Sequence, residues 1–191
     1  MTVDIRIKKT KRNIFQTFLK LITQIPFQKI TVYQIYTEAE IAKSTFYDHF
    51  DDKYDLLEQV IQLVSEEFNS EVERKFAELN QKNFLESLTN IFLNLSKNHN
   101  ELRALLKIHE TPITLESELK QKLVETCRKY LNQQRISNQF SIDFLSHFYG
   151  QLSVASITFA LDHYDNQDWM AQQLQLMNDM QQNLLFKVLP G

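Results

Sequence analysis

Polar side chains that can donate hydrogen bonds to nucleic acid are concentrated between residues 41 and 50. If this segment is a helix, Ala42, Phe46 and Phe50 recur at i, i+4 and i+8 and form its buried side. The side chains left on the outward face and its flanks are Lys43, Ser44, Thr45, Tyr47, Asp48 and His49. Ammonium, hydroxyl and imidazole groups on one helix face can contact phosphate oxygens and base edges in a major groove. An ordinary solvated helix face has the same pattern, so the spacing alone leaves both interpretations open.

A second group of cations lies near the N-terminus. Five of seven consecutive residues are basic: Arg6, Lys8, Lys9, Lys11 and Arg12. Residues 1–50 hold eight Lys and Arg against four Asp and Glu, a net charge of +4, whereas residues 51–191 hold 13 against 20, a net charge of −7. A basic segment of this kind is typical of a nucleic-acid contact, although a short basic tail is often only solvated.

The motifs of the common enzyme classes are not present in the sequence. It has two glycines and one cysteine, with no phosphate-binding glycine loop, no Cys-x-x-Cys and no His-Glu-x-x-His. Asp143 and His147 are spaced i, i+4, and His163 lies between Asp162 and Asp165, so a metal site is conceivable there. Ordinary surface or core histidines explain these pairs more simply. We therefore expect no enzyme activity, no metal and no cofactor.

The elements that position these residues must be helices. Two Gly and three Pro make five residues that break helices, where ordinary usage would give roughly 23 in a chain of 191 residues. A β-sandwich or barrel, which needs frequent turns, is nearly excluded. A single cysteine forms no internal disulfide, and neither a signal-peptide pattern nor an apolar run of membrane-spanning length is present. We expect a cytoplasmic protein that makes no membrane contact.

Hydrophobic periodicity predicts an all-α fold of about nine helices. The expected helices span about 8–24, 31–37, 41–49, 53–79, 84–95, 100–106, 114–131, 139–163 and 165–188. Pro26 ends the first helix, and a tight turn near Glu38–Glu40 separates the next two in the order of a helix-turn-helix. The sequence predicts an N-terminal helix-turn-helix head at 1–53 and a helical body at 54–191.

The stretch from Ile30 to Leu57 resembles the N-terminal DNA-binding domain of the TetR-type (TetR/AcrR) family of transcriptional regulators. It reads ITVYQIYTEAEIAKSTFYDHFDDKYDLL, and the residues in register with the family pattern are Lys43, Thr45, Phe46, Tyr47, His49, Phe50 and Lys53. The resemblance implies a three-helix DNA-binding head, a helical ligand-binding body and a two-fold dimer made by the last two helices. It further implies phosphate contacts from Thr31, Tyr47, His49 and Lys53, with Lys43, Ser44 and Thr45 nearest the bases.

The sequence departs from the family pattern at two positions of the motif. Glu40 stands where the family commonly has Gly, so it is expected to adopt a left-handed conformation at a cost of roughly 1 kcal/mol or more. Ala42 stands where a capping Ser is common, a loss of about 1 kcal/mol. Asp48, Asp51 and Asp52 also outweigh the lysines of residues 41–53. We therefore expect modest, salt-sensitive DNA affinity that relies on the basic N-terminal segment.

The body offers candidates for an effector pocket and for a dimer interface. The pocket candidates are Phe84, Phe92, His109, Cys127, Tyr130, Phe144, His147 and Phe148, which could enclose a small apolar or amphipathic effector. The interface candidates are Gly150, Ser153, Ser156, Ile157 and Ala160 in the eighth helix, with Met177 and Leu184 in the ninth. Small residues would let two helices approach closely, although the eighth helix could equally be a core helix of one subunit.

These observations together predict a ligand-responsive regulator of the repressor type. It would bind a near-palindromic operator in double-stranded DNA as a homodimer, because two-fold pairing doubles the few base-reaching side chains of one head. The alternative is a helical ligand-carrier or protein-interaction protein that keeps the fold and has lost DNA binding, as the acidic segment around Asp48 would allow.

Overall fold

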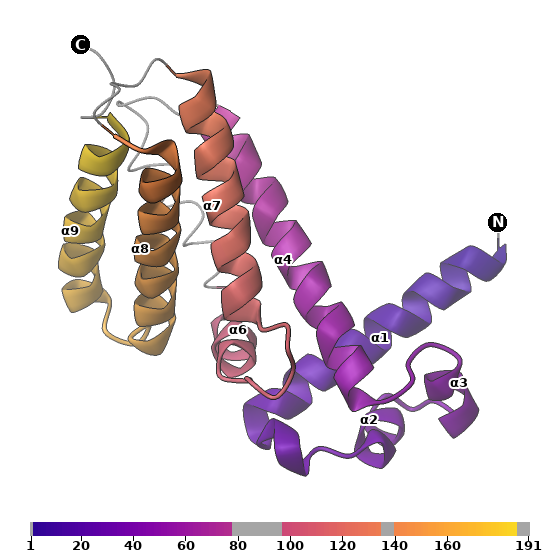
Figure 1. The fold of residues 1–191 in the computed structure, drawn as a ribbon. Helices are drawn as coiled ribbons and strands as arrows, with labels where there is room; N and C mark the ends of the chain where they lie inside the picture. Colours follow the sequence, from indigo (N-terminus) through magenta and orange to yellow (C-terminus); the bar gives the residue numbers. More distant parts are fainter. Residues whose placement is uncertain (1, 78–96, 135–139, 187–191) are drawn as a thin grey trace.

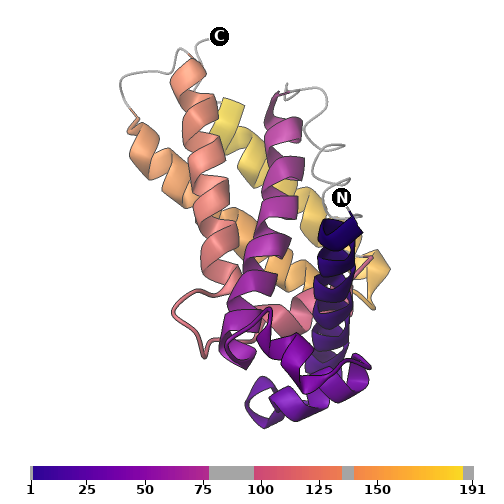
Figure 2. The same ribbon diagram turned by 90° about the vertical axis from the view of Figure 1, so that its right-hand side faces the viewer.

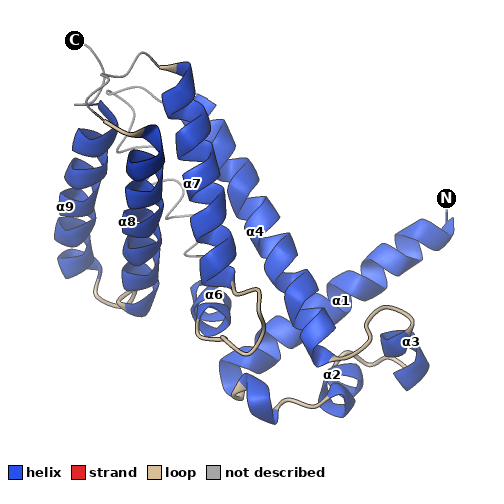
Figure 3. Cartoon of the chain, viewed as in Figure 1, coloured by secondary structure: helices blue, strands red, loops and turns tan. Residues whose placement is uncertain are grey.

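The computed structural model describes residues 2–77, 97–134 and 140–186, and all regular structure in these ranges is helical (Figure 3). In chain order the elements are α1 (Thr2–Gln24), the single 3₁₀ turn η1 (Phe27–Lys29), α2 (Val32–Glu38), α3 (Lys43–Tyr47), α4 (Lys53–Ala77), α6 (His99–Leu106), α7 (Leu115–Gln133), α8 (Ile142–Asp162) and α9 (Gln167–Phe186). The all-α fold class is confirmed. The helix expected at 84–95 lies outside the described residues.

Two of the expected helices have different bounds. α1 begins at Thr2 and not near residue 8, so the basic segment is helical. Residues 2–8 show no apolar period, but they contain no Gly or Pro, and α1 continues through them. α3 has only five residues where nine were expected, because Ala42 is its N-cap and Asp48 its C-cap.

The head is built around aromatic and aliphatic side chains from α1, α2 and α3. Ile14 and Phe18 of α1, Ile35 of α2 and Phe46 of α3 have no exposed surface. The ring of Phe50 lies 5.5 Å from that of Phe46, centroid to centroid. Each such side chain contributes about 1.5–3 kcal/mol on burial, so this core fixes how α2 and α3 sit on α1.

α4 joins the head to the body. Its 25 residues span about 37 Å at 1.5 Å per residue. Leu56 and Leu57 are buried near its start and Val72 and Phe76 near its end. α4 packs along α7, and the two helices lie side by side in both views (Figure 1; Figure 2).

The body consists, among the described residues, of α4 together with α6–α9. α8 packs between α7 and α9 (Figure 1). Thr114 caps α7 as predicted, with its Oγ1 accepting from the Ser117 backbone N–H at 3.1 Å. None of the described helices is both long and apolar enough to cross a membrane. α4 begins at the predicted division between residues 53 and 54, and that division stays a prediction.

Candidate nucleic-acid interface

α2 begins at Thr31 with a reciprocal pair of hydrogen bonds. The Gln34 backbone N–H donates to Thr31 Oγ1 at 3.2 Å, and the Thr31 backbone N–H donates to Gln34 Oε1 at 2.9 Å. This capping box satisfies backbone donors that a helix start otherwise leaves without partners. It holds the exposed Thr31 at a fixed point of the head surface.

The turn after α2 is held in place by the left-handed conformation of Glu40, whose φ is 53°. The Glu40 N–H donates to Thr37 O at 3.1 Å, and the Ile41 N–H donates to Tyr36 O at 3.0 Å. These two bonds form a Schellman motif, in which the left-handed position usually carries glycine. Asn13 Nδ2 on α1 also donates to Ala39 O at 2.7 Å, which fixes the turn to the first helix. The expected left-handed Glu40 is confirmed.

α3 presents the polar face that its spacing predicts. Phe46 points into the core, while Lys43, Ser44 and Asp48 are exposed and Tyr47 keeps 49% of its surface exposed. Thr45 and His49, the predicted flanks, are half-buried. The Lys43 ammonium lies 5.9 Å from the Tyr47 ring centroid. The N-cap is Ala42, whose methyl group cannot accept the capping hydrogen bond.

Part of the acidic segment serves as a helix cap. Asp52 Oδ1 accepts from the Tyr54 and Asp55 backbone N–H groups at 2.7 and 2.9 Å, so Asp52 caps α4. Asp55 Oδ2 in turn accepts from the Asp51 N–H at 2.9 Å. A carboxylate at a helix N-terminus is favoured by the exposed backbone N–H groups and the helix dipole. Asp52 therefore stabilises the start of α4, while Asp48 and Asp51 remain exposed beside α3.

The predicted DNA-contacting cations of α1 and α4 differ in how far they are exposed and in what they contact. Lys8, Lys9 and Arg12 are exposed on α1, the N-terminal half of which extends away from the body (Figure 1). Lys11 is half-buried, and its Nζ donates to Gln59 Oε1 on α4 at 3.1 Å. The Lys53 ammonium points into the head and donates to backbone carbonyls there.

The head also exposes an aromatic residue of α2 that is not one of the sequence candidates. Tyr33 on α2 has 65% of its surface exposed, and its ring meets that of Tyr36 edge to face at 5.5 Å. Ile35 marks the buried side of α2, and Tyr33 is not on that side. This spacing relative to Ile35 is the sequence feature that could have identified Tyr33 as an exposed residue.

The predicted effector residues separate into buried and exposed groups. Cys127 and Tyr130 are buried in the body, where the Phe76 ring meets Tyr130 and Tyr149 at 5.6 Å each. Burial raises the pKa of the Cys127 thiol to about 12, so the thiol stays protonated at neutral pH. Two further candidates, Phe84 and Phe92, lie outside the described residues.

Three of the predicted pocket residues lie on the outside of α8. Phe144 and Phe148 are 63% and 46% exposed, with stacked rings 6.0 Å apart, and His147 is exposed beside them. Leu145 and Tyr149 hold the inward positions of these helical turns, and the expectation that the three exposed residues line a pocket stays a prediction.

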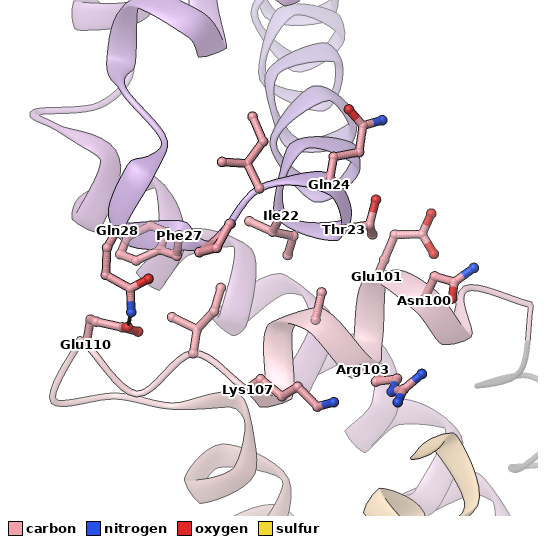
Figure 4. A pocket seen from close by; sticks show the side chains of 14 residues that line it. Ile22, Thr23, Gln24, Phe27, Gln28, Asn100, Glu101, Arg103, Lys107 and Glu110 are labelled. Atoms are coloured by element: carbon pink, nitrogen blue, oxygen red, sulfur yellow. Dashed lines mark hydrogen bonds between the residues drawn. The ribbon is translucent and has the colours of Figure 1, made fainter. Parts of the chain in front are cut away.

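The described residues line hollows at more than one place. His109, a predicted contact, lines one of about 490 Å³ between α6 and α8, together with Val154, Thr158 and Leu161. The second, of about 680 Å³, lies between the head and the body, where the end of α1 and η1 face α6 (Figure 4). Across it, Gln28 Nε2 donates to Glu110 Oε1 and links the two parts.

The small residues of α8 are used within the chain. A Cβ at Gly150 would lie 2.5 Å from Val124 Cγ2 and 3.3 Å from the Lys120 carbonyl, both on α7. Ser153 Oγ accepts from Gln181 Nε2 of α9 at 3.1 Å. Within one chain, α7 therefore lies against Gly150 and α9 against Ser153, and the expectation that these two residues meet a second subunit stays a prediction. The other interface candidates are buried (Ser156, Ala160) or half-buried (Ile157, Met177, Leu184).

α8 and α9 also expose apolar residues, at positions other than the predicted interface residues. On α8 they are Phe144 and Phe148, and on α9 they are Leu176 and Met180, which are 58% and 46% exposed. Each pair is spaced i, i+4 and so lies on one side of its helix.

The fold and the head together define a class: an all-helical protein with an N-terminal helix-turn-helix DNA-binding domain on a helical body. The family model described as bacterial regulatory proteins, tetR family, matches residues 14–60, which include Thr31, α3 and the start of α4. Residues 14–60 are therefore similar to the DNA-binding domain of the TetR-type family of transcriptional regulators, and the chain shares its fold with structures of that family.

Solved structures share the fold over nearly the whole chain. A TetR-family regulator structure from Syntrophomonas wolfei is 15% identical, with a TM-score of 0.71 over 93% of this chain and 95% of that one. A TetR regulator from Streptococcus agalactiae is 23% identical, with a TM-score of 0.64 over 95% and 98%. FadR from Bacillus subtilis, solved in complex with stearoyl-CoA, is 16% identical, with a TM-score of 0.70 over 92% and 97%. No curated protein sequence matches the chain.

Proposed function

We propose that the protein is a cytoplasmic, ligand-responsive transcriptional repressor, not an enzyme, that binds a near-palindromic operator as a homodimer. The observation that carries the proposal is the exposed polar face of α3, in which Lys43, Ser44 and Tyr47 surround the buried anchor Phe46. The Schellman turn and the α2 capping box hold this face rigidly. A preorganised helix face with donors is suited to reading a major groove.

The proposed contacts divide into two groups. Lys43, Ser44 and Thr45 at the start of α3 lie nearest the base edges, where a lysine can donate to guanine acceptors. Thr31, Tyr47 and His49 lie around them and would contact phosphates, and the exposed cations of α1 add electrostatic attraction.

The testing experiment is a gel-shift competition with the DNA that flanks the protein's own gene. We expect one fragment to compete better than random duplex at moderate salt, and binding to weaken steeply as salt rises. The double variant Lys43→Ala/Tyr47→Ala should lose this preference, whereas Lys29→Ala, which removes an exposed cation outside α3, should retain it. If random duplex competes as well as every fragment, the regulator proposal fails.

The homodimer would form through the outer faces of α8 and α9. Phe144, Phe148, Leu176 and Met180 expose apolar surface on adjacent helices, and a second copy would cover it. The proposed interface uses the same two helices that the resemblance implies, but a different side of them.

An effector would act through the body. FadR from Bacillus subtilis, which shares the fold, was solved in complex with stearoyl-CoA, an amphipathic ligand. In this chain the hollow between α6 and α8 combines Val154 and Leu161 with His109, which suits a small amphipathic molecule. Thermal-shift screening followed by titration of each hit into the protein–DNA complex tests this step.

The alternative, a helical carrier or interaction protein without DNA binding, rests on Asp48 and Asp51, which are exposed at and just after the C-terminal end of α3. Their charges would oppose a phosphate backbone. Effector binding by the body in the absence of any salt-sensitive duplex binding would favour this alternative.

A further inference from the structure

The C-terminal end of α8 is held against α6 by one carboxylate. Asp162, the last residue of α8, accepts a hydrogen bond from Arg103 Nε at 2.8 Å, and the same oxygen, Oδ1, lies 3.3 Å from Lys107 Nζ. Arg103 lies in the last turn of α6 and Lys107 is its C-cap, so the two cations are spaced i, i+4. Burial acts to raise the pKa of the Asp162 carboxyl, but the hydrogen bonds from both cations outweigh it and the pKa lies below its usual value.

The same three side chains belong to the lining of the hollow of about 490 Å³ between α6 and α8. Apolar side chains of α8, among them Val154, Ala155 and Leu161, line this hollow as well. A hollow of this size that combines apolar walls with a few charged groups is typical of sites for small amphipathic molecules.

The two cations offer more hydrogen-bond donors than one carboxylate oxygen can accept. A guanidinium has five N–H donors and an ammonium has three, whereas both groups face the single Oδ1 atom of Asp162. Arg103 and Lys107 are 42% and 59% exposed, so a molecule from solvent can reach them. An incoming anion would therefore compete with Asp162 for these two cations.

We propose that the hollow between α6 and α8 binds a small carboxylate with an apolar tail, and that the carboxylate takes the place of Asp162 on Arg103 and Lys107. The tail lies along the apolar side chains of α8. A carboxylate suits the two cations better than a neutral or cationic group, because it accepts charge-assisted hydrogen bonds from both and can accept two parallel bonds from the guanidinium. The proposal rests on the ligand-responsive function proposed above, for which it names the class of effector.

Displacement of Asp162 would weaken the contact between α8 and α6. Asp162 lies at the C-terminal end of α8, where the helix dipole disfavours a negative charge, so its carboxylate depends on the two cations. α6 packs against α1 of the head as well as against α8. Arg103 and Lys107 also line the hollow between head and body, where both side chains are seen (Figure 4). A carboxylate that favours the conformation in which α6 is released from Asp162 would thereby change how the body supports the head.

The test measures the binding of octanoate, octanol and octylammonium to the full chain by isothermal titration calorimetry. The three probes share one tail and differ in the charge of the head group. We expect octanoate to bind about tenfold or more tightly than the other two, because only octanoate accepts charge-assisted hydrogen bonds. Equal affinities for the three probes, or no binding of octanoate, would overturn the proposal.

Asp162→Asn tests the displacement, because it removes the competing charge and nearly keeps the side-chain size. We expect octanoate to bind this variant about ten- to a hundredfold more tightly than wild type, while the affinity for octanol stays the same. Glu116→Gln is the matched control, since it removes one negative charge from the same hollow and leaves the Asp162 contacts in place. Its gain should be about fivefold or less, the range for an exposed charge. Equal gains in the two variants would indicate a general effect of charge and would overturn the proposal.

The double variant Arg103→Met/Lys107→Met should lose the preference for octanoate over octanol. Lys129→Met, which removes an exposed cation of α7 outside the hollow, should keep this preference. If the double variant does not fold, Lys107→Met alone carries the test, because it leaves the hydrogen bond between Arg103 and Asp162 in place. We expect Lys107→Met to bind octanoate about tenfold more weakly, and unchanged affinity would overturn the proposal.

Failure of this site and failure of DNA binding are distinguishable, because the calorimetric measurements need no DNA. Octanoate binding that responds to Asp162→Asn as expected would support the site even if no duplex is bound. Tight duplex binding by a protein that does not distinguish octanoate from octanol would overturn the site and leave the DNA-binding function standing.

Discussion

At the scale of single residues, Glu40 occupies a backbone conformation that favours glycine. We expect Glu40→Gly to raise the free energy of unfolding by about 1 kcal/mol, because it removes the left-handed strain of a residue with a Cβ. Glu38→Gly is the matched control: Glu38 is the last residue of α2, and glycine there should destabilise by up to about 1 kcal/mol. Urea unfolding measures both, and equal losses in the two variants would contradict the strain at Glu40.

Lys43 and Tyr47 are adjacent on α3, yet their removal should affect DNA binding differently. If Lys43 donates to a guanine edge, Lys43→Ala costs about 1–3 kcal/mol on the preferred site and relaxes the preference at one base position. Tyr47→Phe removes one phosphate hydrogen bond and should weaken binding to all duplexes alike. Selection of binding sites from a random pool, with each variant, separates the two. An unchanged base preference in Lys43→Ala would indicate that Lys43 contacts only the DNA backbone.

Cys127 should make the protein sensitive to alkaline pH. Burial raises the pKa of its thiol from 9.0 to about 12, so above pH 9 the unfolded chain loses a proton that the folded chain keeps. The contribution of the protonated thiol to the free energy of unfolding is fully present below pH 9. It falls by up to about 1.4 kcal/mol per pH unit as the pH rises toward 12. We expect Cys127→Ala to flatten the slope of unfolding free energy between pH 9 and 10. The control is Tyr149→Phe, since burial also raises the pKa of Tyr149 but its ordinary value is 10.0, so its effect should start higher. Identical slopes in wild type and Cys127→Ala would show that the thiol does not cause the loss of stability at alkaline pH.

Residue types and spacing predict the local features of the head but not its long-range contacts. The exposed polar face of α3 around Phe46 follows from helical periodicity, and the left-handed Glu40 follows from the backbone conformation of the turn. Both could be predicted from the sequence. The position of the Lys53 ammonium depends on carbonyls 23 to 26 residues away, which spacing along the chain does not contain.

At the scale of helices, α8 shows how close packing limits substitution. Gly150→Leu would place side-chain atoms where Val124 and the Lys120 carbonyl of α7 already lie. We expect a loss of about 1–3 kcal/mol or more in unfolding free energy from this overpacking. Ala155→Leu, on the exposed side of the same helix, should change stability far less. Thermal unfolding compares the two, and a Gly150→Leu variant of wild-type stability would mean that α7 and α8 can move apart freely.

The dimer proposal makes a separate prediction for α9. Leu176 is exposed on α9, and Leu63 is 41% exposed on α4, so the same Leu→Glu change can be made at both. A carboxylate at Leu176 would be buried without a partner in the proposed interface, and we expect that variant to dissociate to a folded monomer. Leu63→Glu should stay dimeric in sedimentation experiments. A dimer of normal strength from Leu176→Glu would place the interface elsewhere.

Helix existence was more predictable than helix orientation. α4 and α7 carry one apolar side each, and their starts at Lys53 and Leu115 agree with the sequence prediction within a residue. α8 is apolar around most of its circumference, so periodicity could not tell which residues face α7 and which lie outside. For this reason the sequence predicts a dimer contact for the small residues beside Gly150 and a pocket position for Phe144 and Phe148, whereas the structure has Gly150 against α7 and both phenylalanines exposed.

At the scale of the whole molecule, α4 joins the head to the body as one continuous helix. The head also meets the body through α1 and α6 and through the Gln28–Glu110 hydrogen bond. In the proposed dimer, a change in the body could therefore alter the separation of the two heads. An effector does this only if it binds the DNA-competent and the DNA-incompetent states with different affinities.

The proposed dimer predicts how operator spacing controls affinity. Two α3 helices related by a two-fold axis require half-sites about one helical turn, or a multiple, apart. Inserting five base pairs between the half-sites turns one of them to the opposite side of the duplex, so the dimer can contact only one. We expect the affinity to fall to that of a single half-site for the wild-type protein. Leu176→Glu, expected to be monomeric, should bind both spacings equally. Gel shifts with the two duplexes measure this, and equal wild-type affinity for both would show that the heads bind independently.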